Sequence, residues 1–112
     1  MKAFRKELPV MGKEHFVRFA SVTGDFNPVH YDLEFAKRLH LSNVISQGPL
    51  TFALALDAIA SEVGLDNVAS MSARTTAPVL PDTRLTMSHK QDGSFVVTGG
   101  DVTYLVGQVK SR

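Results

Sequence analysis

The chain has 112 residues, of which 44% are hydrophobic and 21% charged, so it has the size and composition of one globular domain over residues 1–112. Its formal net charge of +1 gives no electrostatic reason to expect nucleic acid or an anionic membrane as a partner. Because the chain has no cysteine, it has no disulfide, thiolate nucleophile or cysteine metal site.

Neither a signal peptide nor a membrane span is expected. Residues 1–15 lack the apolar run of a secretory signal. The longest uncharged stretch, Leu41 to Leu56, contains several polar residues and is too short to cross a bilayer. Together with the lack of cysteine, these features predict a cytoplasmic protein.

The first half of the chain is predicted to form a short strand followed by helices. Residues 4–10 predict the strand, and the apolar spacing over 13–22 predicts an amphipathic helix that ends at Gly24. Asp32 is a suitable N-cap for a second helix over 33–39, which carries acidic residues at its start and basic residues near its end.

A third helix is predicted over residues 49–63. Pro49 fits the first helical position, where its missing N–H costs nothing, and Gly64 is a natural end. Apolar residues occur on nearly every face of the first two turns, so we expect other structure to wrap around this helix.

After Asp66 the pattern changes to strands. Alternating or β-branched stretches separated by turn residues occupy 68–77, 85–90, 95–98 and 101–109, with an Asp-Gly turn over 91–94. In the last stretch, alternation predicts Val102, Tyr104 and Val106 on one face and Thr103, Leu105 and Val109 on the other. Helices followed by strands predict an α+β fold, with an antiparallel sheet curled around the helix over 49–63.

Residues 23–32 concentrate the chemistry-bearing side chains. Asp25 and His30 lie five residues apart, and Asn27 and Pro28 turn the chain between them. A carboxylate and a neutral imidazole could both bind one water, as general-base activation requires. Asn27 could orient either neighbour or cap a turn.

A purely structural interpretation of Asp25 and Asn27 is also possible, because Asp and Asn before a helix are common caps. A second element, residues 46–49, favours chemistry. Gly48 opens the buried helix, so its amide can point at an anion or a developing oxyanion. An acid–base pair with an oxyanion donor suits the addition of water to, or its removal from, a double bond conjugated to a carbonyl.

The remaining candidates favour packing or surface roles. His15, His40 and His89 show no metal-ligand spacing with His30, so no metal site is expected. No serine stands in a nucleophile elbow, and no glycine-rich phosphate loop is present.

In these motifs the sequence resembles the MaoC-type (R)-specific enoyl-CoA hydratases of the hot-dog superfamily. The resemblance covers about residues 13–85 and rests on Thr23-Gly-Asp-Phe-Asn-Pro-Val-His30, Asp32, Phe35-Ala36, Gln47-Gly-Pro-Leu-Thr51 and Thr76-Ala-Pro-Val79. It implies a hot-dog fold with a long central helix, a homodimer or heteromer, and an active site near the interface.

The resemblance also implies the roles of individual residues. Asp25 and His30 would be the catalytic pair that hydrates a trans-2-enoyl thioester, and the Gly48 amide would hold the thioester oxygen. Asn27, Gln47 and Pro49 would support the site or contact the substrate. The substrate would be an acyl-CoA or acyl-carrier thioester. No separate cofactor would be needed, since CoA is part of the substrate.

Three positions depart from the family pattern. Gln47 stands where the family usually has His, and Pro49 where it usually has Met. The turn at 81–83 is shortened, and the strand region after it is compressed. These departures bear on the shape and length of the substrate tunnel and on the geometry of the dimer.

Other functions remain open at this stage. A hot-dog thioesterase would use a similar helix start without needing the Asp25–His30 pair. A non-catalytic acyl-CoA-binding subunit, or a subunit that requires a heterologous partner, would fit the compressed second half. Arg74, Arg84 and Lys90 could meet CoA phosphates, although charged residues on strands usually face solvent.

Overall fold

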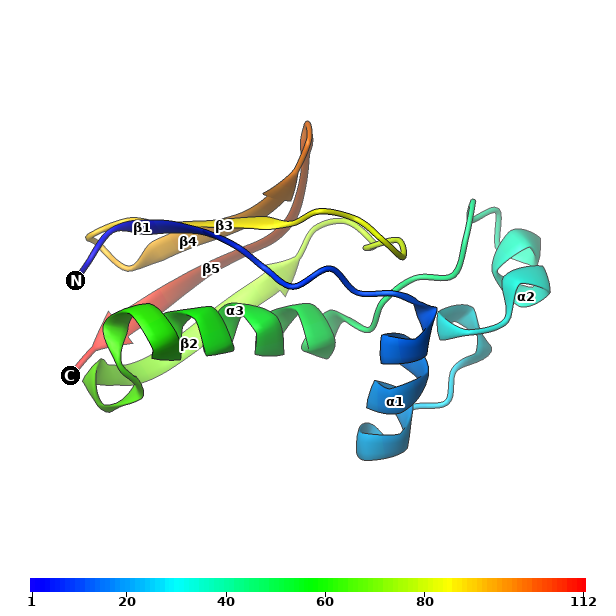
Figure 1. Cartoon of the computed structure of the whole chain (residues 1–112), viewed down its shortest axis with the longest axis horizontal. Helices are drawn as coiled ribbons and strands as arrows, with labels where there is room; N and C mark the ends of the chain where they lie inside the picture. Colours follow the sequence, from blue (N-terminus) through cyan, green and yellow to red (C-terminus); the bar gives the residue numbers. More distant parts are fainter.

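The computed structural model describes residues 1–112 (Figure 1). In chain order the elements are β1 (Phe4–Glu7), α1 (Lys13–Thr23), the 3-10 turn η1 (Pro28–His30), α2 (Leu33–Arg38), α3 (Gly48–Val63), the 3-10 turn η2 (Leu65–Asn67), β2 (Val68–Thr75), β3 (Thr86–His89), β4 (Ser94–Gly99) and β5 (Val102–Ser111). None of the helices is both long enough and apolar enough to cross a bilayer.

The five strands form one antiparallel sheet in the order β1-β3-β4-β5-β2, and α3 runs along one of its faces (Figure 1). This confirms the predicted α+β fold with a late sheet against one long helix. Strands β1 and β2 are the two edges. Strand β1 is shorter than predicted: pairing continues through the Leu8 N–H, which donates to the Leu85 carbonyl at 2.9 Å, and the next residue, Pro9, has no N–H.

The helix ends follow the signals in the sequence. Gly24 ends α1 in the left-handed conformation with φ 77°, and its N–H donates to the Ala20 carbonyl. The Asp32 carboxylate caps α2 by accepting the Phe35 N–H at 3.2 Å. Pro49 lies in the first turn of α3, which begins one residue earlier than predicted.

The core lies between α3 and the sheet. Its largest fully buried side chains are Phe16, Ile59, Leu85, Met87, Leu105, Val44, Val97 and Val109. From α3 itself, Thr51, Ala55, Ala58 and Ile59 are buried, at the spacing of one helical face. Pro49 and Ala53 are exposed, so this single chain covers one side of α3 and does not wrap the helix completely as the apolar pattern predicted.

The predicted alternation along the last strand is wrong at Tyr104. Tyr104 and Leu105 are adjacent and both buried, whereas Val102 is exposed. The cause is a β-bulge: Leu105 pairs with Val97 and Thr103 pairs with Thr98, which leaves Tyr104 as the extra residue. A bulge shifts the side-chain alternation by one position. The apolar pattern of one strand alone does not reveal a bulge, because a bulge depends on the pairing with the neighbouring strand.

The segment with α1 and α2 lies beyond the N-terminal end of α3 and gives the molecule its 44 Å long axis (Figure 1). Several hydrogen bonds join this segment to the rest, including one between the His30 ring and the Ile45 carbonyl at 2.7 Å. Val29 accepts from the Ile45 N–H at 3.1 Å, Phe16 accepts from Gln47 Nε2 at 2.8 Å, and the Asp82 N–H donates to Met11. These contacts place η1 beside the start of α3.

Candidate active site

The chain from Asp25 to His30 is folded by its own polar side chains. Asp25 Oδ1 accepts the Asn27 N–H at 3.2 Å, and Asn27 Oδ1 accepts the Val29 N–H at 3.1 Å. Each is the side-chain-to-backbone turn that Asp and Asn favour. Asn27 therefore caps η1, which was one of the two roles that the sequence left open for it.

The His30 ring is held in one orientation by a backbone carbonyl. Its Nδ1 lies 2.7 Å from the Ile45 oxygen, and the residue is only 8% exposed. A carbonyl oxygen only accepts, so Nδ1 carries the hydrogen. In the neutral ring, Nε2 is then the nitrogen with the free lone pair, as a general base requires.

Asp25 approaches the same nitrogen. Its Oδ2 lies 3.6 Å from His30 Nε2, which is longer than a hydrogen bond, and its side chain is 53% exposed. The two groups are therefore neighbours without a direct bond. One water placed between them can donate one hydrogen to Nε2 and the other to the carboxylate.

Gly48 offers a free backbone donor at the start of α3. As the first residue of the helix it has no intrahelical acceptor, and its N–H forms no hydrogen bond within the chain. The helix dipole also favours negative charge at this end. A Cβ at this position would lie 3.1 Å from Thr75 Cγ2, so only glycine fits here without displacing its neighbour.

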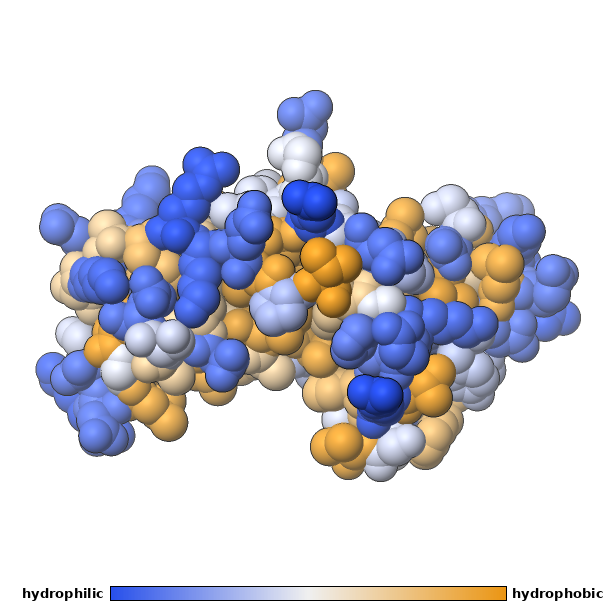
Figure 2. Space-filling view, viewed as in Figure 1, coloured by the Kyte–Doolittle hydropathy of each residue, from blue (hydrophilic) through white to orange (hydrophobic).

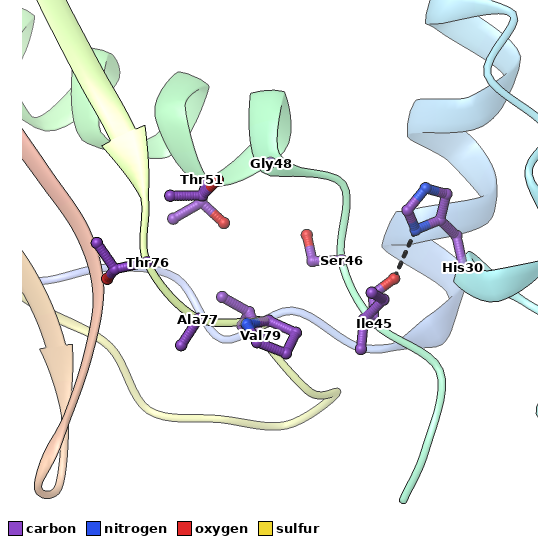
Figure 3. A pocket seen from close by; sticks show the side chains of 10 residues that line it. His30, Ile45, Ser46, Gly48, Thr51, Thr76, Ala77 and Val79 are labelled. Atoms are coloured by element: carbon purple, nitrogen blue, oxygen red, sulfur yellow. Dashed lines mark hydrogen bonds between the residues drawn. The ribbon is translucent and has the colours of Figure 1, made fainter. Parts of the chain in front are cut away.

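His30 and Gly48 open onto one cavity of about 410 Å³. Figure 3 shows His30 on one side of it and Ser46, Gly48 and Thr51 on the other. The other lining residues are Ile45, Thr75, Thr76, Ala77, Pro78 and Val79. A second cavity of about 370 Å³ is lined by Gly48, Pro49, Phe52, Ala73, Thr75 and Leu105. Both cavities share Gly48 and Thr75, so they adjoin at the start of α3.

The structure brings four of the six predicted site residues together, whereas Asn27 caps η1 and lines neither cavity. His30 and Gly48 line the first cavity, Pro49 lines the second, and Asp25 adjoins His30. Gln47 lines neither cavity. Its side chain is buried and donates to the Phe16 carbonyl, so it ties the start of α3 to α1.

The hydroxyl groups are the part of the site to which the sequence analysis gave no role. Ser46, Thr51, Thr75 and Thr76 all line the first cavity. Thr51 had one sequence signal, since it stands one helical turn after Gly48. No group of three or more His, Cys, Asp or Glu side chains is placed to hold a metal ion.

The family of the chain follows from comparison with known proteins. The family profile described as "MaoC like domain" matches residues 2–109. The chain belongs to this family. It is also similar to a UPF0336 protein of Streptomyces avermitilis, with 31% identity over 108 residues, 88% of this chain and 72% of that relative being covered.

Solved structures with the same architecture support the fold. The R-hydratase PhaJ1 from Pseudomonas aeruginosa, in its unliganded form, superposes with a TM-score of 0.82 at 22% identity, covering 99% of this chain and 80% of that one. A chain of the ChsH1–ChsH2 complex from Mycobacterium tuberculosis gives a TM-score of 0.77 at 18% identity, covering 99% and 98%. The predicted hot-dog fold is confirmed.

Proposed function

We propose that this protein catalyses the reversible hydration of trans-2-enoyl thioesters to (R)-3-hydroxyacyl thioesters, with an acyl group carried by CoA or by a carrier protein. One observation carries the proposal: a histidine whose Nε2 is free to act as a base opens onto the same cavity as an unpaired helix N-terminal amide. Membership of the MaoC-like family supports hydratase or dehydratase chemistry in general.

In the proposed reaction the Gly48 N–H binds the thioester oxygen. Water held by Asp25 and His30 loses a proton to this pair and adds through its oxygen to C3. The C2=C3 electrons move toward the carbonyl, and the oxygen gains enolate character that the Gly48 amide and the α3 dipole stabilise. The pair then delivers a proton to C2, which completes the addition of one water molecule. The reverse sequence of steps is dehydration.

The test is the absorbance of the conjugated enoyl thioester after the purified protein is added to short- and medium-chain trans-2-enoyl-CoA. We expect the band to disappear, and Asp25→Asn and His30→Ala to slow this by about 10²- to 10⁴-fold. His40→Ala is the matched control, since His40 is exposed and outside both cavities. Release of free thiol would indicate a thioesterase instead. No change at any chain length would contradict catalysis and favour a binding subunit.

We further propose that the protein acts as a homodimer. The outer edge of β2 has no partner strand, and one side of α3 is uncovered in the single chain. Figure 2 shows apolar residues on the surface of α1, where Val17 and Val22 are exposed, and Phe26 beside Asp25 is 56% exposed.

Sedimentation equilibrium should give a dimer; a monomer with full activity would contradict this. An inactive monomer activated by another protein would indicate a heteromer, as in the two-protein complex above.

A further inference from the structure

Thr51 carries a hydroxyl group that forms no hydrogen bond within the chain. The residue is only 1% exposed, and it lines the cavity that contains His30 and Gly48. Because this hydroxyl is not used by the protein and its residue lines the cavity, it is free to donate to an acceptor bound there.

Two of the neighbouring hydroxyl groups and the usual acceptor are already occupied. Ser46 Oγ donates to the Gln47 carbonyl at 3.1 Å, and Thr76 Oγ1 donates to the Thr103 carbonyl at 2.6 Å. A helical threonine commonly donates to the carbonyl four residues earlier, which for Thr51 is the carbonyl of Gln47. That oxygen accepts from Ser46 and from the Leu50 N–H, and Thr51 does not use it.

The geometry of the helix directs Thr51 toward the free amide. Side chains on a helix lean toward its N-terminus and lie over the residue three or four positions earlier. For Thr51 the residue three positions earlier is Gly48, which has no side chain to intervene. Figure 3 shows Thr51 and Gly48 on the same side of the cavity, in the first turns of α3. An oxygen that accepts from the Gly48 N–H is therefore within reach of the Thr51 hydroxyl.

We propose that Thr51 donates a second hydrogen bond to the thioester oxygen of the substrate, beside the Gly48 amide. The inference rests on the proposed function and adds a catalytic residue to it. Because the oxygen gains negative charge as water adds, the bond strengthens in the transition state and raises kcat more than it lowers KM. A single oxyanion-hole donor is worth about 10²- to 10³-fold in kcat.

The kinetic test compares Thr51→Val with Thr51→Ser. Valine keeps the shape and removes the hydroxyl, whereas serine keeps the hydroxyl and removes the methyl. We expect Thr51→Val to lower kcat by about 10²-fold with KM little changed, and Thr51→Ser to remain within a few-fold of wild type. Thermal unfolding checks that both variants fold. Equal kcat for wild type and Thr51→Val, or equal losses in both variants, would overturn the inference.

A binding measurement separates failure of this inference from failure of the proposed function. Calorimetry would compare saturated butyryl-CoA with its thioether analogue, in which a methylene replaces the carbonyl. Wild type should prefer the thioester, and Thr51→Val should lose a large part of that preference. If Thr51→Val keeps the whole preference, Thr51 is not a donor, although thioester recognition stands. If wild type binds neither compound, both proposals are wrong.

Discussion

Replacing Gly48 by alanine tests how closely α3 must approach β2. Alanine keeps a backbone N–H at position 48, but the added Cβ would lie 3.1 Å from Thr75 Cγ2, tighter than ordinary contact by a few tenths of an ångström. Either the methyl of Thr75 or the start of α3 must move. Since a misplacement of about 1 Å can cost about 10²-fold in rate, a shift of this size should lower kcat about 10-fold.

Stability should change much less than activity in the Gly48→Ala variant. Alanine favours a helix over glycine by about 1 kcal/mol, and this offsets most of the strain from crowding. We expect the free energy of unfolding, measured in urea, to change by less than about 1 kcal/mol. A large loss of stability would show that the defect is in folding and not in the position of the amide.

A second substitution provides the control. Thr75→Ser removes the Cγ2 methyl and keeps the hydroxyl, so the double variant Gly48→Ala with Thr75→Ser should recover a rate within about threefold of Thr75→Ser alone. The assay is hydration of the same enoyl-CoA by all four proteins. Wild-type kcat in Gly48→Ala, or a double variant no faster than Gly48→Ala, would refute the reasoning.

Two further substitutions test the surroundings of the site. Gln47→Glu places a buried carboxylate, which has no hydrogen to donate, against the Phe16 carbonyl. Urea unfolding at pH 7 should show a loss of about 3 kcal/mol in the free energy of unfolding, and this loss should shrink at acid pH as the carboxyl is protonated. Equal stability of the variant and the wild type would mean that Gln47 is not tightly enclosed. The Ser94 hydroxyl and N–H hold the pKa of Asp92 below its usual 3.8, an effect that stabilises the fold above that pH and is lost as pH falls through the lowered pKa. Ser94→Ala should therefore destabilise slightly at pH 7 and less as the pH falls below 3.8, and a difference that is larger in acid would contradict this.

The elements of the fold were predictable where the signal is local. Asp32, Gly24 and Gly64 end or begin helices through contacts within a few residues, and all three do so in the structure. The bulge at Tyr104 was not predictable, because it is a property of the pairing between β4 and β5. The uncovered side of α3 likewise depends on how all the elements pack together, because the apolar composition of a helix does not show which other elements cover each of its faces.

The candidate site divides in the same way. The proximity of Asp25 and His30 follows from one turn of chain, which Asn27 caps, and the spacing alone favoured it. The partner of His30 Nδ1 lies fifteen residues away at Ile45, and no sequence pattern indicates it. The direction of the Gln47 side chain, toward α1 and away from the cavities, also depends on tertiary packing.

The four residues before and at the start of α3 assemble the site more than the motif at 23–32 does. The Ile45 carbonyl fixes the tautomer of His30, the Ser46 N–H binds the Val79 carbonyl at 2.8 Å, Gln47 holds α1, and Gly48 presents its N–H. The base and the oxyanion donor are thus attached to one continuous backbone stretch. A shift of this stretch moves both groups together, so substitutions here should change kcat through the orientation of His30 and the Gly48 amide at once, even though Asp25 is untouched.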